Sequence, residues 1–554
     1  MWWACTAPMS SDLLPVSERD ADLILDDGVS LSSRLWSPRG RGPWPALLMR
    51  QPYGRQIAST VTLAHPSWWA AQGYLVVVQD VRGQGDSQGL FRGFSQEADD
   101  TAATHAWVRS LPECNGRLGC YGLSYQGLTQ LSAPEGTEPP DCLTPAMTGL
   151  DERGHWSCEG GAHWWHLGLG WGLQLAALQA ARKGNNEAWT EIRRSLEDGS
   201  YLRDGPGLLQ RHDPDGMAWS WLQKDPSRPE DWTVHAVPDR WLLQPMLLLG
   251  GWWDPHLLGV LDLWRRSRKL GGQPELMIGP ATHLQWWQDV QDQILCFFRR
   301  HLQDREPDTN HGETRLWNLT RRSWHPLDTP PEYSWSLCGN GLACPVTGSG
   351  TLVSTSGVKE TSQGDVGEQT EKTKQIEKIV HDPWRPCPAI GGHLSPSAGA
   401  ADRSDLDQRF DVATFDSKGM ENGRLLSGQP ELRIRVSADQ PGFDLCLGLS
   451  RIPFGEERVE QLSTGHLRVL GDGALQAAWR VVQLQPLLAS LDQGDRLRLS
   501  VAAAAWPSIG VNPGCTDVPC GAPSSSHRVV TLTLHLADSR LQLKSFNSGR
   551  LQLD

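Results

Sequence analysis

The sequence predicts an α/β core that is interrupted by a helical segment and followed by an all-β sandwich. Three observations lead to this prediction. From residue 20 to about 130, short apolar runs alternate with helical patterns; between about 150 and 235 the residues favour helices; after about 310, short strands alternate with turn residues. With 554 residues, the chain is long enough to form several domains.

The strands of the predicted core are short apolar runs. Such runs are typical of strands buried on both faces, as in a parallel sheet that helices cover. Helical patterns, including residues 96–111 and 289–302, separate or follow them. We therefore expect the core to span residues 15–150 and 236–310. Its clearest strands are PALLMR (45–50), YLVVVQD (74–80), QPMLLLGG (244–251) and PELMIGP (274–280).

The rest of the chain divides into a helical and a β part. Residues 151–235 contain GGAHWWHLGLGWGLQLAALQAARKG and NEAWTEIRRSLEDG, which have few β-branched residues and predict a helical cap. Residues 311–554 carry LRIRVSA, DLCLGLS and RVVTLTLHL, which predict a β-sandwich. A polar, Gly/Ser/Thr-rich stretch near 347–380 predicts a mobile insertion within it.

The composition argues against several kinds of partner. A formal net charge of −13 disfavours binding to nucleic acid or to an anionic membrane. No apolar run reaches the roughly 18 residues that span a bilayer, and the start MWWACTAPMSSD lacks the regions of a signal peptide. We therefore expect a cytoplasmic protein with no membrane contact. The oligomeric state stays open, and a homo-oligomer is one outcome.

The twelve cysteines are scattered, and no C-x-x-C pair stands beside histidines at a spacing typical of zinc. We expect no metal and no organic cofactor. Buried free thiols are the expected state of these residues. In a cytosolic protein, neither Cys338 with Cys344 nor Cys515 with Cys520 is expected to form a disulfide.

The sharpest local motif is RLGCYGLSYQGLTQ, in which a short apolar strand leads into Gly122, Ser124 and Gly127. A serine at a tight strand-to-helix turn presents its hydroxyl at the edge of a sheet, and glycines are needed where the backbones crowd. Gln126 stands where the commoner G-x-S-x-G pattern has its second glycine, so spacing alone leaves a structural serine as the alternative. The preceding strand favours a nucleophile.

A nucleophilic serine needs a base and an acid that orients the base. Asp254 ends the strand-like run QPMLLLGGWWDPH, and His283 follows PELMIGP, so the chain order is serine, acid, histidine. Both follow the carboxyl ends of predicted strands, where open α/β sheets build their sites. We predict Ser124, Asp254 and His283 as catalytic residues. The nearest competitors, expected to be structural, are His256, His301 and Asp262.

Acyl transfer also needs hydrogen-bond donors at the developing oxyanion. The backbone N–H of Tyr125, directly after the nucleophile, is the expected first donor. The loop after PALLMR is QPYGR, so Tyr53 stands where the second donor is expected, and its phenol is able to donate. A tyrosine in a loop otherwise more often serves packing.

Together these residues resemble the cocaine-esterase-like hydrolases, a family shared with X-Pro dipeptidyl-peptidases and α-amino-acid ester hydrolases. The family form of the elbow is G-x-S-Y-x-G, which Gly122 to Gly127 match. The resemblance spans most of the chain and lies in RQPYGR, VQDVRGQGDSQG, ECNGRLGCYGLSYQG, GGWWDPH, IGPATH, FFRRHL and HDPWRPCPAIGG.

The resemblance implies an α/β-hydrolase core with an inserted helical cap, followed by an all-β jelly-roll domain. It implies Ser124 as nucleophile, Asp254 as orienting acid and His283 as base, with Tyr53 and Tyr125 as oxyanion hole. Two stretches depart from the family. LSAPEGTEPPDCLTPAM replaces a longer helix after the elbow, and the insertion near 347–380 has no counterpart. Cap tryptophans such as Trp156, Trp164, Trp165 and Trp171 are not carried over individually.

The predicted function is therefore a serine hydrolase that cleaves small esters or amides through an acyl-enzyme, as a carboxylesterase or acylase. An X-Pro dipeptidyl-peptidase acting on short peptides is the close alternative; it requires a carboxylate for the substrate's amino terminus, and Glu159 of the cap is a candidate. A non-catalytic glycan- or partner-binding protein is the alternative from another class, since jelly rolls often bind glycans.

Overall fold

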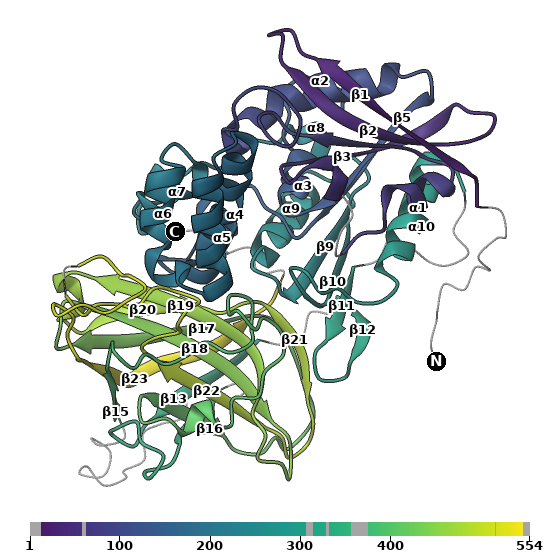
Figure 1. The fold of residues 1–554 in the computed structure, drawn as a ribbon. Helices are drawn as coiled ribbons and strands as arrows, with labels where there is room; N and C mark the ends of the chain where they lie inside the picture. Colours follow the sequence, from purple (N-terminus) through teal and green to yellow (C-terminus); the bar gives the residue numbers. More distant parts are fainter. Residues whose placement is uncertain are drawn as a thin grey trace.

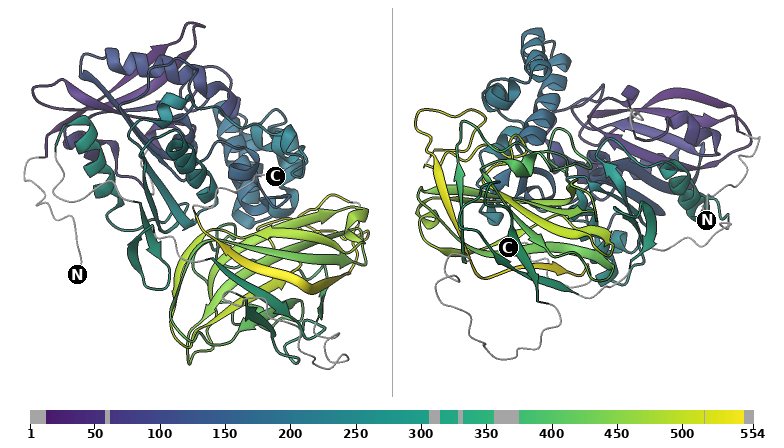
Figure 2. Two further views of the ribbon diagram at one scale, coloured as in Figure 1. Left: turned by 180° about the vertical axis from the view of Figure 1, so that it is seen from behind. Right: turned by 90° about the horizontal axis from the view of Figure 1, so that it is seen from below.

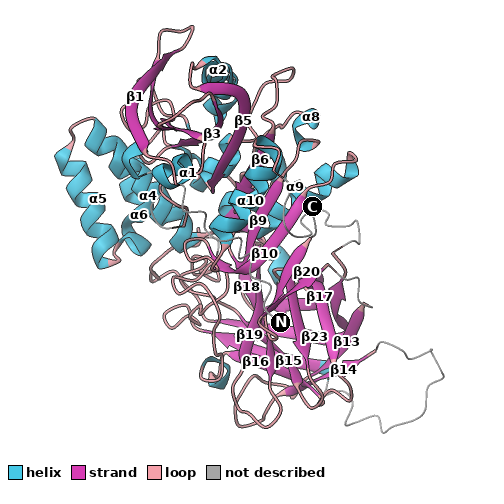
Figure 3. Cartoon of the chain, turned by 90° about the vertical axis from the view of Figure 1, so that its right-hand side faces the viewer, coloured by secondary structure: helices cyan, strands magenta, loops and turns pink. Residues whose placement is uncertain are grey.

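A computed structural model describes residues 13–57, 62–305, 314–327, 332–355, 375–515 and 517–546. The chain forms an α/β part built on one large sheet, a group of helices beside it, and a separate β part (Figure 1). The helices gather around the first sheet and the strands of the β part form a second body (Figure 3). The predicted fold class is confirmed.

The first sheet has the strand order β1-β2-β4-β3-β5-β6-β9-β10-β11-β12. Strands β3 to β6 and β9 to β11 run parallel, whereas β1, β2 and β12 pair antiparallel at the two edges. The strands are β1 (Val16–Ile24), β2 (Ser30–Pro38), β3 (Trp44–Gln51), β4 (Leu75–Asp80), β5 (Cys114–Leu123), β6 (Cys142–Ala146), β9 (Leu247–Trp253), β10 (Glu275–Thr282), β11 (Arg315–Asn318) and β12 (Ser323–Pro326).

Helices cover both faces of this sheet, because alternate side chains of each central strand point to opposite sides. Leu48 and Val77 pack with residues of α2, α8 and α9, whereas Leu47 and Val76 pack with residues of α1 and α10. This double cover explains why the central strands are continuous apolar runs. The helices are α1 (Pro66–Ala71), α2 (Glu97–Ser110), α3 (Tyr125–Thr129), α8 (Asp239–Leu242), α9 (Leu257–Lys269) and α10 (Val290–Leu302).

The cap lies between β6 and β9 in the chain and contacts the β part. After a π-helical turn at Arg153–Ser157, it forms the short hairpin β7 (Cys158–Glu159) and β8 (Ala162–His163) and continues with four α-helices. The backbone N–H of Trp165 donates to the carbonyl of Ser508 (2.8 Å), which joins the first cap helix to the β part. Figure 2 shows the helices from two further sides. They are α4 (Trp165–Arg182), α5 (Asn186–Asp198), α6 (Tyr201–His212) and α7 (Met217–Leu222).

The β part is an eleven-stranded sheet that encloses its own apolar core. Both ends of the predicted insertion at 347–380 are strands here, β14 and β15, because Leu352 and Ile379 alternate with polar residues and enter that core. Residues 356–374 lie outside the described residues. The strands are β13 (Tyr333–Cys338), β14 (Gly350–Ser354), β15 (Ile376–His381), β16 (Val412–Ser417), β17 (Arg424–Ala438), β18 (Gly442–Ile452), β19 (Glu460–Leu470), β20 (Ala478–Gln483), β21 (Leu487–Leu491), β22 (Arg496–Ala502) and β23 (Val530–Lys544).

The predicted bounds 15–150, 151–235, 236–310 and 311–554 stay a prediction. Among the described residues, no helix has the length and apolar character needed to cross a membrane.

Candidate active site

Ser124 occupies the turn between β5 and α3, which is the place that the elbow motif predicts. Its backbone has φ 60° and ψ −125°, a strained conformation for a residue with a side chain. The turn is held because the Ser124 N–H donates to the carbonyl of Ala146 on the neighbouring strand β6 (2.9 Å). The hydroxyl is therefore presented at the carboxyl end of the parallel sheet.

The structure explains the unusual spacing of the elbow glycines. Gly122 has φ +136°, and a Cβ there would lie 2.4 Å from the Cβ of Gln126. A Cβ on Gly127 would lie 2.8 Å from the Cβ of Thr148. The Gln126 side chain folds back and accepts the N–H of Leu123 (3.1 Å). The Gln126 side chain thus holds the turn by a hydrogen bond to the backbone of the turn itself. The position where only glycine fits against a neighbouring segment is therefore 127, one residue later than in the common motif.

Asp254 and His283 form a hydrogen-bonded pair at the same edge of the sheet. His283 Nδ1 lies 2.6 Å from Asp254 Oδ2, and the Asp254 carboxylate is fully buried. The second oxygen, Oδ1, accepts the backbone N–H of His256 (2.9 Å), which fixes the carboxylate plane. Because Nδ1 of His283 faces the acid, Nε2 is the ring nitrogen left for another partner.

The sheet order brings the three predicted residues to one edge. Strands β5, β6, β9 and β10 are successive neighbours, and Ser124, Asp254 and His283 come directly after β5, β9 and β10. Within the described part of the chain, Ser124 makes no hydrogen bond to His283; its hydroxyl lies close enough to the Tyr53 phenol to affect the pKa of that phenol. Such catalytic bonds are often long before a substrate binds.

Tyr53 lies in the loop after β3 and points its phenol at the nucleophile. The phenol accepts the indole N–H of Trp171 on α4 (3.1 Å) and lies near the Ser124 hydroxyl. Burial raises the pKa of Tyr53 to about 12, while the bonds to Trp171 and Ser124 act in the opposite direction. The phenol therefore keeps its proton near neutral pH and is a hydrogen-bond donor.

Tyr125 contributes to the elbow with its backbone and its side chain. It is the first residue of α3, where the N–H groups have no partner inside the helix. Its buried phenol donates to Glu97 Oε1 (2.7 Å), and Glu97 pairs with Arg50 (3.0 Å). Sequence reasoning missed this support of the elbow, because Arg50 and Glu97 lie on β3 and α2, far from the motif in the chain.

An aromatic cluster from the cap and the core lies beside Tyr53. The ring centroids of Phe94 and Trp156 are 4.6 Å apart, those of Trp156 and Trp171 5.9 Å, and those of Trp171 and Trp221 5.8 Å. Because Trp171 bonds directly to the Tyr53 phenol, this cluster, the aromatic wall, borders the site through Trp171. Trp164 and Trp165 instead lie where the cap meets the β part.

Two acids of the cap are already engaged by protein groups. Glu159 accepts from His466 Nδ1 (2.8 Å) and lies 2.5 Å from His393 Nε2, so it joins the cap to the β part. These histidines lower the pKa of the Glu159 carboxyl despite the opposing effect of burial. Glu152 accepts from Trp221 Nε1 (2.9 Å) and contacts His235 Nε2 (3.0 Å). Neither carboxylate is free to receive a substrate group.

The competing residues take other places. His301 lies on α10, with its ring 4.6 Å from that of Phe297, and Asp262 on α9 pairs with Arg266 (3.8 Å). His256 is the exception, because its ring centroid lies only 5.0 Å from that of His283.

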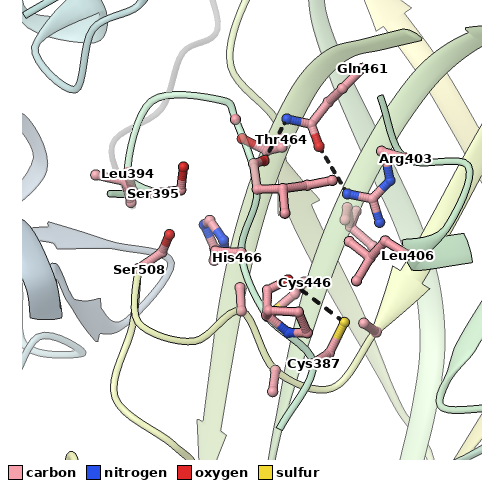
Figure 4. A pocket seen from close by; sticks show the side chains of 18 residues that line it. Cys387, Leu394, Ser395, Arg403, Leu406, Cys446, Gln461, Thr464, His466 and Ser508 are labelled. Carbon is pink, nitrogen blue, oxygen red and sulfur yellow. Dashed lines mark hydrogen bonds between the residues drawn. The ribbon is translucent and has the colours of Figure 1, made fainter. Parts of the chain in front are cut away.

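Two cavities of the structure differ in size and in the part of the fold where they lie. One of about 290 Å³ lies beside Tyr53, between the loops that contain Arg55 and Asp86 and helix α4. In the β part, a cavity of about 30 Å³ is lined by residues such as His466 and Ser508 and is large enough only for water (Figure 4).

Among the described residues there is no group of three His, Cys, Asp or Glu side chains arranged for a metal, and the eleven described cysteines are free thiols.

Comparisons with known proteins agree with this architecture. Residues 27–285 match the family described as X-Pro dipeptidyl-peptidase (S15 family), and residues 345–541 match the X-Pro dipeptidyl-peptidase C-terminal non-catalytic domain. A cocaine esterase from Rhodococcus sp. (strain MB1 Bresler) is 25% identical over 527 residues, covering 87% of this chain and 86% of the relative.

Solved structures share the fold over nearly the whole chain. An aminopeptidase from the marine sediment archaeon Thaumarchaeota archaeon has a TM-score of 0.68 at 18% identity, with 96% of this chain and 97% of that chain covered. An α-amino acid ester hydrolase has a TM-score of 0.67 at 17% identity, with 97% and 99% covered. A CocE/NonD family hydrolase from Staphylococcus aureus has a TM-score of 0.66 at 15% identity, with 95% and 93% covered.

The catalytic and the C-terminal domain of one family thus occur in order along the chain, and together they span most of it. The protein belongs to the S15 peptidase and cocaine-esterase-like family of serine hydrolases.

Proposed function

We propose that the protein is an esterase or acylase in which Ser124, His283 and Asp254 form the catalytic triad. The observation that carries the proposal is the 2.6 Å bond between His283 and a fully buried Asp254, at the sheet edge where Ser124 sits in a strained turn. This pair holds His283 with Nε2 available to take the Ser124 proton as the hydroxyl attacks a carbonyl carbon.

The negative charge that develops on the carbonyl oxygen meets two donors, the Tyr53 phenol and the Tyr125 N–H. The protonated His283 then gives its proton to the departing alcohol or amine, which leaves the acyl group on Ser124. Water attacks this ester, with His283 again as the base, and restores the serine. The raised pKa of Tyr53 supports this role, because only a protonated phenol donates to an oxyanion.

The aromatic wall supports an acyl group with an aromatic or other apolar part. Trp171 bonds to the proposed oxyanion donor Tyr53, and Trp156 packs against Trp171, so we expect an acyl chain on Ser124 to contact indole rings. Substrates of the expected class are small esters or amides.

The second candidate, an X-Pro dipeptidyl-peptidase, has the support of the family descriptions. It needs a carboxylate for the substrate's ammonium group. Glu159 is bound by two histidines of the β part, and Glu152 by Trp221 and His235. Both acids would have to give up buried partners first, so we favour ester or acyl substrates.

Covalent labelling and a substrate panel test the proposal. A fluorophosphonate probe is expected to label the wild-type protein and not Ser124→Ala, while Asp254→Asn labels far more slowly. Aryl esters are expected to be hydrolysed at least tenfold better, by kcat/KM, than a glycyl-prolyl anilide. Label that persists in Ser124→Ala, or none in the folded wild type, contradicts the triad. A preference for the anilide establishes the peptidase instead, and no label on Ser124 would favour the non-catalytic alternative.

A cytoplasmic location and a homo-oligomer stay predictions. Cell fractionation and analytical ultracentrifugation test them directly.

A further inference from the structure

His256 brings a second imidazole next to the proposed catalytic base. It precedes α9, two residues after Asp254, and its ring centroid lies 5.0 Å from that of His283. On its other sides it contacts indole rings, with centroids 4.4 Å from Trp156 and 5.7 Å from Trp164. His256 therefore lies where the base and the aromatic wall meet.

The hydrogen bonds of His256 fix which ring nitrogen carries the proton. Nδ1 lies 2.6 Å from the main-chain carbonyl oxygen of His155, and a carbonyl oxygen only accepts, so Nδ1 donates. Burial lowers the pKa of His256 to about 4, which keeps the ring neutral near pH 7. Nε2 is thus an acceptor, and within the described residues no protein donor bonds to it.

His256 is unsuited to act as the base itself. Its ring has no carboxylate partner, because Asp254 Oδ2 bonds to His283 and Asp254 Oδ1 bonds to the main-chain N–H of His256. That N–H would hold Asp254 equally well with any side chain at position 256. The structural contacts of this residue therefore leave the second ring nitrogen without a role.

We propose that His256 is a specificity-determining residue whose Nε2 accepts a hydrogen bond from a hydroxyl or amide N–H on the acyl part of the substrate. This inference rests on the proposed function and names its substrate class. A neutral acceptor in an aromatic setting suits a neutral donor, whereas an ammonium group is better matched by a carboxylate. Two carboxylates of the cap are already bound by protein groups: Glu152 by Trp221 and His235, and Glu159 by two histidines of the β part.

Four p-nitrophenyl esters with one carbon frame test the inference. Phenylacetate, mandelate, N-acetylphenylglycinate and phenylglycinate carry hydrogen, hydroxyl, amide N–H and ammonium at the same carbon. For each ester, kcat/KM of His256→Phe is divided by that of the wild type, which cancels the intrinsic reactivity of the ester. Because one neutral hydrogen bond is at stake, we expect a loss of about 3- to 10-fold on mandelate and N-acetylphenylglycinate. Phenylacetate should change less than about twofold.

Two further variants are the controls. His256→Gln keeps an acceptor and is expected to retain the preference for the donor-bearing esters. His301→Phe alters a histidine on α10 outside the site and should leave all four ratios near one. Equal losses on all four esters in both His256 variants overturn the inference, as does a loss confined to phenylglycinate. If the wild type takes no phosphonate label and hydrolyses no ester, the proposed function fails and the inference fails with it.

Discussion

Replacing Tyr53 by Phe tests the proposed oxyanion hole most directly. The change removes one hydroxyl and keeps the ring, so the loop after β3 retains its packing. In the structure this hydroxyl is one of two proposed donors, with the Tyr125 N–H as the other. Loss of one oxyanion donor costs about 2.7–4 kcal/mol of transition-state stabilisation, so kcat should fall about 10²- to 10³-fold. KM should change little, because the ground-state carbonyl needs the donor less.

The pH dependence adds a second check. Burial raises the pKa of Tyr53 to about 12, so the phenol stays protonated from pH 6 to about 10. The ratio of wild-type to Tyr53→Phe activity should therefore be constant across that range. Stopped-flow kinetics with an aryl ester measure kcat and KM. Trp171→Phe is the matched control, since it removes the 3.1 Å bond to the phenol but leaves the donor, and we expect a smaller loss. A Tyr53→Phe variant within fivefold of wild type refutes the reasoning.

Two further predictions concern stability and the elbow. Glu159→Gln should lower the free energy of unfolding by about 1–3 kcal/mol, because His393 and His466 lose a charged acceptor. Because the pKa of the Glu159 carboxyl is lower in the folded than in the unfolded protein, the stability difference between wild type and variant should be complete above about pH 4.5. It should vanish as the pH falls through the folded-state pKa. Urea titrations at several pH values measure this difference, and a difference that does not change with pH contradicts the prediction. Gly122→Ala should slow phosphonate labelling and lower Tm, because its Cβ would lie 2.4 Å from that of Gln126. The double variant with Gln126→Gly should recover part of the Tm, and a single variant with wild-type labelling argues against a strained turn.

Local patterns predicted the fold class and the order of the proposed site residues. The apolar runs at 45–50 and 74–80 are strands β3 and β4, buried under helices on both faces. Serine, acid and histidine each follow such a strand, and parallel strands place their carboxyl ends at one edge. For these elements, the information lies within a few residues of each motif.

Contacts between segments far apart in the chain have no local sequence pattern that predicts them. His466 lies 307 residues from Glu159, and Trp171 lies 118 residues from Tyr53. Glu159 therefore looked like a free carboxylate for a substrate amine, whereas the structure pairs it with two histidines. The sequence favours a structural role for His256, whereas its ring lies 5.0 Å from that of His283 beyond the ends of the paired strands β9 and β10.

The β part helps to hold the site, although its own cavity is large enough only for water. Its strand β19 binds Glu159 of the cap through His466, and a Cβ on Gly160 would lie 1.9 Å from the His466 carbonyl oxygen, so the two parts meet backbone to backbone. The cap in turn supplies Trp171, which bonds to the Tyr53 phenol beside Ser124. A change at the contact between β7 and β19 should therefore reach the oxyanion donor through the cap. For this reason, we expect the labelling rate of Ser124 to change when that distant contact is altered.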